Sequence, residues 1–244
     1  MLYQLRTNPR IGFSLVSECA DGFIDLPLSD YEQKSEPIVN LSSQTMKVAH
    51  LPHSYSPPSF IREFATQAHS RGRAVTATKI PDFWSTNPLP TVSDRLRVLI
   101  EDLDPGVHRF VPIVMRDRVS GEVLADGAYH LLLCGRLVEI DPAINQVSKD
   151  NCDVFGFAYP STQGSDNIEA RIYQTIVSDT SIQRTLSEFP LWRFNTRSIE
   201  NFPFGCREIL YSNARLVKAA QALKLRGFNE TKGLTTRDVN HVWY

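Results

Sequence analysis

The chain has 244 residues, with 26 lysines and arginines against 27 aspartates and glutamates, which gives a formal net charge of −1. A hydrophobic content of 42% and a charged content of 22% are typical of globular proteins, and the balanced charge argues against a general nucleic-acid binder. The N-terminal MLYQLRTNPRIGF lacks the apolar run of a secretory signal, and no apolar stretch of about 18 residues predicts a transmembrane helix. The four cysteines form no CxxC pair, so we expect a cytoplasmic protein that binds neither nucleic acid nor membranes.

Short strands and loops are predicted for the first part of the chain. Residues 11–16, IGFSLV, read as a strand, and residues 17–58 hold short apolar pieces broken by proline, serine and acidic residues. The next segment, SFIREFATQAHSRG, predicts a helix over residues 59–72, with Ser59 as the N-cap and Gly72 at its end. Its apolar stripe would consist of Ile61, Phe64, Ala65 and Ala68.

Two later segments repeat this pattern of a capping serine, an apolar stripe and a terminal glycine. SDRLRVLIEDLDPG predicts a helix that begins after Ser93 and ends at Pro105 and Gly106. SNARLVKAAQALKLRG predicts a helix that begins after Ser212 and ends at Gly227. The stripes consist of Leu96, Leu99, Ile100 and Leu103 in the first helix and of Leu216, Ala219, Ala220 and Leu223 in the second.

Strands are predicted between and after these helices, in runs rich in β-branched or apolar side chains. Two of the runs flank a turn at Ser120 and Gly121, which suggests a hairpin. The predicted strands cover residues 73–80, 107–117, 128–141, 169–178, 191–195 and 207–211.

Strands outnumber helices and do not alternate strictly with them. This order indicates an α+β fold with a mixed, largely antiparallel sheet and a few Ser-capped amphipathic helices. We expect residues 71–244 to form this α+β domain, with residues 1–70 as a strand- and loop-rich segment packed on it. The sequence leaves open whether that segment is a separate subdomain.

Candidate catalytic and metal-binding residues are few. His50 and His53 are the only close histidine pair, but the proline between them favours a polar loop over a metal site. Glu139 and Asp141 lie two residues apart on a predicted strand with His130 upstream, so the two carboxylates share a face and could do acid–base chemistry. The favoured interpretation is strand termination, since Asp-Pro often ends a strand. There is no GxSxG, GxxxxGK[ST] or GxGxxG motif, and no catalytic, metal or cofactor site is expected.

An ordered set of motifs extends over roughly residues 75–230. It consists of PDFW, VSDRLRVLIEDLDPGVHRFVPIVM, YHLLLCGRLVEID, LWRF and ILYSNARLVKAAQALKLRGF. This series resembles the immunity proteins of bacterial polymorphic-toxin systems, typified by a myxobacterial immunity protein. Such proteins are often encoded beside secreted toxins, including effectors of contact-dependent and type VI secretion.

The resemblance implies an antitoxin without catalytic residues, which binds a cognate toxin and blocks its active site or substrate access. The partner would be the toxin encoded by the adjacent gene, and the free protein would be a monomer or dimer without a cofactor. The shared residues would make the fold: Phe83, Ser93, Leu96, Leu99, Pro105, Gly106, Phe110, Pro112, Asp141, Trp192, Ser212 and Gly227.

Acidic side chains are the candidate toxin contacts, since a nuclease toxin would present a basic active-site surface. They lie in the segment 21–36 and in the polar loop 145–167. The candidates are Asp21, Asp25, Asp30, Glu32, Glu36, Asp150, Asp153 and Asp166.

Two alternatives stay open. The first is an enzyme in which His108, His130, Glu139 and Asp141 converge in a cleft. The second is a structural or assembly protein that forms a large symmetric oligomer. In the stretch DPGVHRFVPIV, His108 and Arg109 should point to opposite faces of the strand, so that only one of them can face solvent or a toxin.

Overall fold

The computed structural model describes residues 2–5, 14–18, 36–39, 46–56, 65–69, 80–85, 90–117, 119–140, 176, 179–194 and 210–227. The strands are β1 (Leu2–Leu5), β2 (Ser14–Glu18), β3 (Glu36–Val39), β4 (Met46–His50), β5 (Ala65–His69), β6 (Phe83–Ser85), β7 (Pro90–Ser93), β8 (Arg109–Asp117), β9 (Val123–Leu133), β10 (Arg136–Ile140), β11 (Leu191–Phe194) and β12 (Leu210–Asn213). The helices are α2 (Asp94–Leu103), α4 (Thr180–Glu188) and α5 (Ala214–Ala222). None of these helices has the length and apolar content that a membrane span requires.

The described strands form two six-stranded sheets, in the orders β1-β12-β11-β10-β4-β3 and β2-β5-β8-β9-β7-β6. The pairs β10–β11 and β5–β8 are parallel, and the other described pairs are antiparallel. The expected α+β fold with mixed, largely antiparallel sheets is therefore confirmed. Strands from the first 70 residues pair with later strands in both sheets, as β1 does with β12 and β5 with β8. The division of the chain near residue 70 stays a prediction.

The helix predicted after Ser93 is confirmed. The hydroxyl of Ser93 accepts a hydrogen bond from the backbone N–H of Leu96 at 3.3 Å, which satisfies a free donor of the first turn. The helix α2 ends at Leu103 with Asp104 as its C-cap, and Gly106 then adopts a φ of +70°, a conformation that glycine adopts without strain. The predicted stripe lies inward, since Leu96, Leu99 and Ile100 are buried.

The C-terminal helix is confirmed, but its predicted cap is wrong. Ser212 belongs to β12, where its backbone pairs with both β1 and β11. The cap of α5 is Asn213, whose side-chain oxygen accepts hydrogen bonds from the N–H groups of Arg215 at 3.0 Å and Leu216 at 3.1 Å. Asparagine caps a helix as well as serine does, so the helix begins one residue later than predicted, and the strand ends at Asn213 instead of residue 211.

The helix predicted over residues 59–72 is wrong where the structure describes it. Residues 65–69 form β5, which is hydrogen-bonded to β2 on one side and to β8 on the other. Pairing on both edges outweighs the weak helical pattern of this segment, because propensity yields to tertiary context. Residues 59–64 and 70–72 lie outside the described residues, as do residues 73–79 of the next predicted strand.

The single strand predicted over residues 128–141 is two strands in different sheets. Cys134 and Gly135 separate β9 from β10. A Cβ atom at Gly135 would lie 1.8 Å from the carbonyl oxygen of Val107, so only glycine lets the two backbones approach this closely. Of the strand predicted over residues 169–178, only Ile176 is described, and it is helical.

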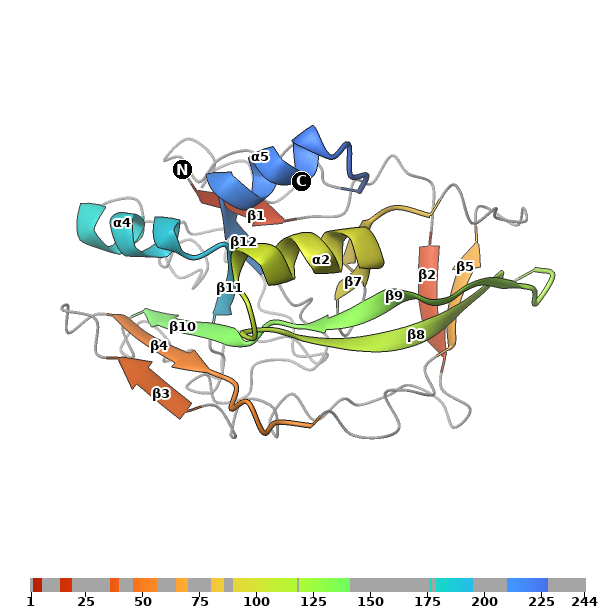
Figure 1. The fold of residues 1–244 in the computed structure, drawn as a ribbon, viewed down its shortest axis with the longest axis horizontal. Coiled ribbons are helices and arrows are strands. Elements are labelled where there is room, and N and C mark those ends of the chain that lie inside the picture. The colour runs from red at the N-terminus through yellow and green to blue at the C-terminus, as the bar shows by residue number, and fades with distance from the viewer. Residues whose placement is uncertain are drawn as a thin grey trace, which may run out of the picture.

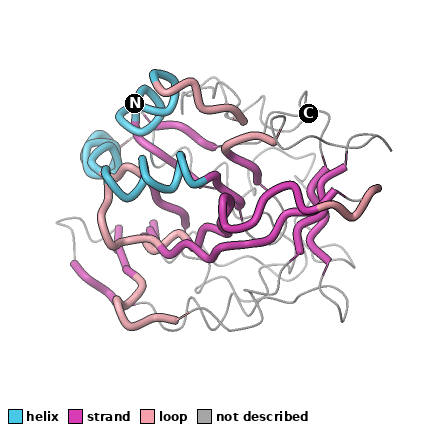
Figure 2. The backbone as a smooth tube through the Cα atoms, turned by 45° about the vertical axis from the view of Figure 1, so that its right-hand side comes forward, coloured by secondary structure: helices cyan, strands magenta, loops and turns pink. Residues whose placement is uncertain are grey.

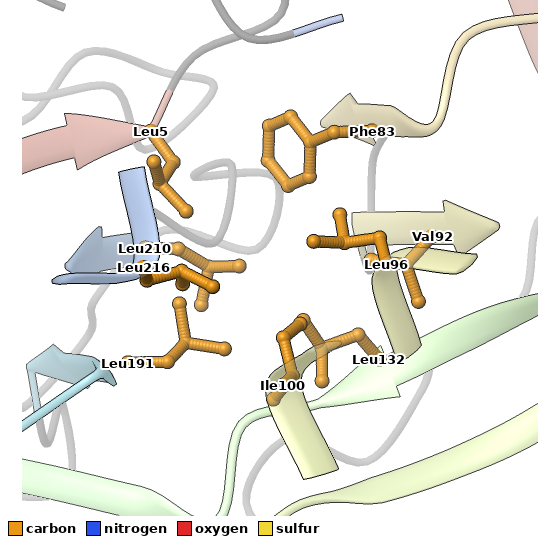
Figure 3. A pocket seen from close by; sticks show the side chains of 9 residues that line it. All are labelled: Leu5, Phe83, Val92, Leu96, Ile100, Leu132, Leu191, Leu210 and Leu216. Carbon is orange, nitrogen blue, oxygen red and sulfur yellow. The ribbon is translucent and has the colours of Figure 1, made fainter. Parts of the chain in front are cut away.

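An apolar cluster beneath the helices joins the two sheets. Figure 1 shows α2 and α5 lying side by side, and in Figure 2 the helices gather on one side of the long β8–β9 hairpin. Beneath α2 and α5, nine apolar side chains from these helices and from strands of both sheets converge (Figure 3). They are Leu5, Phe83, Val92, Leu96, Ile100, Leu132, Leu191, Leu210 and Leu216.

Candidate functional site

A buried polar cluster joins the end of α2 to both sheets. The carboxylate of Asp104 accepts two hydrogen bonds from the guanidinium of Arg136, one from Nη1 and one from Nη2 at 2.8 Å. It also accepts a hydrogen bond from Nε2 of His108 at 3.1 Å. The exposed fractions of Asp104, His108 and Arg136 are 7%, 2% and 7%. A bidentate pair in this setting is both strong and geometrically specific.

The protonation state of this cluster follows from its hydrogen bonds. The backbone N–H of Gly135 donates to Nδ1 of His108 at 3.2 Å, so the proton of a neutral ring lies on Nε2, facing Asp104. Burial lowers the pKa of His108 and outweighs the hydrogen bond with Asp104, which raises it. Burial opposes ionisation of Asp104, but its hydrogen bonds with His108 and Arg136 outweigh burial and lower its pKa. The cluster is therefore a carboxylate, a guanidinium and a neutral imidazole.

The surroundings of Arg136 extend the cluster to α4 and β4. Its guanidinium carbon lies 4.5 Å from the centre of the Phe189 ring, a cation–π contact, and Nη1 donates to the carbonyl of Leu191 at 3.5 Å. On β4, burial and then the charge of Arg136 lower the pKa of His50 to about 4. The side chain of His108 has an exposed fraction of 0%. The geometry thus suits a structural cross-link better than a site that receives a substrate.

A second cluster lies at the N-terminus of α2. Nε2 of His130 is 3.2 Å from Oδ1 of Asp94, and the same oxygen accepts a hydrogen bond from Nε of Arg97 at 2.8 Å. Burial lowers the pKa of His130 and outweighs its contact with Asp94. The Phe110 ring meets the His130 ring edge-on, with 6.4 Å between the centres. Nδ1 of His130 is buried and has no hydrogen-bond partner among the described residues, so this nitrogen does not face solvent.

A third cluster, centred on Asp82, joins the PDFW motif to the two segments that contain α2 and α5. Its carboxylate accepts hydrogen bonds from the Ser93 hydroxyl at 2.7 Å and from the backbone N–H of Arg226 at 2.8 Å. Gly227 adopts a φ of +101°, and a Cβ atom there would lie 2.2 Å from the carbonyl oxygen of Phe83. We call these contacts the Asp82 clasp. They join the start of one helix to the end of the other, and they explain physically why these motifs occur together.

Of the four candidate catalytic residues, only the two histidines have described side chains, and they lie in different clusters. His108 belongs to the Asp104 cluster, whereas His130 belongs to the cluster at the start of α2. The backbone of Glu139 pairs with Lys47 of β4, its side chain is not among those described, and Asp141 lies outside the described residues.

The expectation that either His108 or Arg109 faces outward needs correction. His108 is buried. Arg109 is half-buried and donates hydrogen bonds to the carbonyls of Gly106, His108 and Pro52 at 2.8, 3.0 and 2.9 Å. The polar start of β8 therefore organises the turn that precedes it.

The candidate toxin contacts are almost wholly outside the described residues. Glu36 lies in the edge strand β3, where its backbone pairs with His50, and its side chain is not among those described. The other seven candidates stay predictions: Asp21, Asp25, Asp30, Glu32, Asp150, Asp153 and Asp166. In the described part of the chain, no group of three or more histidine, cysteine or acidic side chains could hold a metal ion.

Sequence reasoning missed Asp104 and Arg136, although both carried a signal. Asp104 follows the last turn of α2, where a negative charge is unfavourable beside the helix dipole and needs a compensating partner. Arg136 interrupts the apolar run LLLCGRLV, and a buried cation in a strand needs an anion.

Comparisons of this chain with protein-family models, with curated proteins and with solved structures found no match. The resemblance to immunity proteins therefore rests on the ordered motifs of the sequence. Three of those motifs, PDFW and the two capped helices, meet in the Asp82 clasp.

Proposed function

We propose that this protein is an antitoxin, an immunity protein that binds a cognate secreted toxin and blocks its active site or access of the toxin's substrate. The observation that carries the proposal is the Asp82 clasp. Three of the five motifs on which the resemblance rests meet at the carboxylate of Asp82, although Asp82 and Arg226 are 144 positions apart in the sequence. They form one structural unit of the fold, which supports the fold-making role that the resemblance to immunity proteins implies for these motifs.

A rigid scaffold suits tight inhibition by surface complementarity. The buried Asp104 cluster and the shared apolar core fix the relative positions of α2, β8 and β10 before any partner arrives. Preorganisation lowers the entropy that is lost on binding, so more of the contact energy appears as affinity. A complex of standard size buries roughly 1,600 Å² in total, which two or three neighbouring elements of this fold could supply.

The test is co-purification with the product of the neighbouring gene, together with rescue of cells that express this product. We expect a 1:1 complex and full rescue by the wild-type chain. A second variant, Gly227→Ala, disturbs the Asp82 clasp. It should rescue fewer cells than the wild type, in proportion to the folded protein that is lost. Absence of both binding and rescue by the wild-type chain would contradict the proposal.

The acidic candidate contacts can be tested separately from the function itself. Replacing Asp21, Asp25 and Asp30 together by lysine should slow association with a basic toxin at low salt, because steering by opposite charges sets the on-rate. An unchanged on-rate would remove this segment from the interface without affecting the proposed function.

A further inference from the structure

The outer side of α5 and the turn that follows it is uniformly basic. The segment 214–227 contains four cations and no aspartate or glutamate. All four are exposed: Arg215, Lys218, Lys224 and Arg226. Two copies of a surface with charges of one sign repel each other, whereas the field of such a surface attracts a partner of the opposite sign.

α2 adds a fifth cation to this surface. The Arg95 side chain has an exposed fraction of 61%, and Nη2 donates to the carbonyl of Leu223 at 2.7 Å, across from α2 to the end of α5. The nearest described carboxylate, that of Asp82, is 3.7 Å from Nη1 of Arg95. That carboxylate is buried and offsets part of the charge of Arg95 alone, because no ion pair within the described residues involves Arg215, Lys218 or Lys224.

The same two helices carry exposed apolar side chains. Leu223 on the turn after α5 has an exposed fraction of 49%, and Val98 on α2 has one of 44%. The other large apolar side chains of the described residues with such exposure are Val119 and Val123, near the tip of the β8–β9 hairpin. Apolar anchors bordered by charges are the usual composition of a protein–protein interface. Single-stranded nucleic acid, in contrast, is bound by cations together with aromatic side chains on which its bases stack.

We propose that this surface, the helix patch of Arg95, Arg215, Lys218, Leu223, Lys224 and Arg226, docks an acidic face of the cognate toxin. The proposal rests on the proposed antitoxin function and adds the chemistry of the partner. Cations around Leu223 meet carboxylates of the toxin, and Leu223 enters an apolar depression between them. With the acidic candidates elsewhere on the chain, the toxin would meet two surfaces of opposite sign. That arrangement fixes the orientation of the complex as well as its rate of formation.

The experiment measures association of the purified neighbouring-gene product, in an inactive form, with two variants of equal net charge. The patch variant carries Arg215→Glu, Lys218→Glu and Lys224→Glu. These three side chains make no hydrogen bond or ion pair that would be lost within the described residues. The control variant carries Lys47→Glu, Arg116→Glu and Arg184→Glu, on β4, β8 and α4, where the replaced cations are also exposed. Thermal melts verify that both variants fold.

We expect the on-rate of the patch variant to fall by at least about tenfold at low salt, and the loss to shrink as salt is raised. The control variant should stay within about twofold of the wild type. Leu223→Ser should accelerate dissociation with little change in on-rate, since short-range contacts act mainly on the off-rate.

Three results would overturn the inference, and they are distinguishable. If the wild type binds and the patch variant associates as fast as the control, the helix patch is not the interface, and the antitoxin function stands. If the wild type itself neither binds nor rescues, the proposed function fails, and the toxin as occupant of the patch fails with it. If single-stranded or duplex DNA or RNA binds the wild type more tightly than the toxin does, and the patch variant loses that binding, the patch is a nucleic-acid surface.

Discussion

Removing the charge of Asp104 tests whether the buried cluster stabilises the fold. Asp104→Asn keeps the size of the side chain. It leaves the guanidinium of Arg136 without an anion, although Arg136 is only 7% exposed. The amide NH₂ can also turn a donor toward the donors of Arg136 and His108. Breaking a buried ion pair from one side costs about 3–5 kcal/mol, because a buried charge stays uncompensated.

The assay is urea or thermal unfolding of the purified protein. The expected loss corresponds to a drop in Tm of roughly 6–20 °C for a domain of this size. Asp102→Asn, at an exposed position on the same helix, is the matched control and should change the free energy of unfolding by less than about 0.5 kcal/mol. In the double variant Asp104→Asn/Arg136→Met both charges are gone, so it should be more stable than Asp104→Asn alone. If Asp104→Asn and Asp102→Asn unfold alike, the cluster does not stabilise the fold and our reasoning about it is wrong.

Three further predictions follow from the same contacts. His50 and His108 have folded pKa values below the unfolded value of about 6.5, so the unfolded chain takes up protons first as the pH falls. The free energy of unfolding, measured in urea, should therefore decrease as the pH falls from about 6.5 towards about 4, and less steeply in His50→Gln. Gly227→Ala should lower the free energy of unfolding by about 1–3 kcal/mol, which is more than Gly121→Ala should lower it. Both glycines have a positive φ, but only a Cβ atom at Gly227 would meet a backbone carbonyl within 4 Å. Equal losses would contradict this reasoning. Asn213→Ala should cost about 1 kcal/mol in the same assay through loss of the α5 cap, and an unchanged stability would remove the assigned capping role.

Elements with a complete local signal were predictable from the sequence. For α2 the signal consists of a capping serine, a stripe that repeats every three to four residues, and Pro-Gly at the end, all within one short segment. The strand β11 was predicted from the short apolar and aromatic run LWRF. α4 carried a comparable signal that was overlooked. Asp179 caps it through the N–H groups of Ser181 and Ile182, and Ile182 and Leu186 lie one turn apart on its buried side.

Elements that depend on distant partners were not predictable in this way. The segment 65–69 becomes a strand because β2 and β8 occupy both of its edges, and neither neighbour is close in sequence. The break at Gly135 depends on the approach of Val107, which comes 28 positions earlier in the numbering. The pairing of Asp104 with Arg136 joins residues 32 positions apart, so the sequence could show that each needed a partner but not which one.

The central claim, that the chain is an antitoxin, is tested most directly by titrating it with the purified product of the neighbouring gene in an inactive form. The account predicts a 1:1 complex with a dissociation constant in the nanomolar range or below, together with loss of the toxin's activity when the active form is used. Absence of a complex at micromolar concentrations, with the toxin fully active, would contradict it.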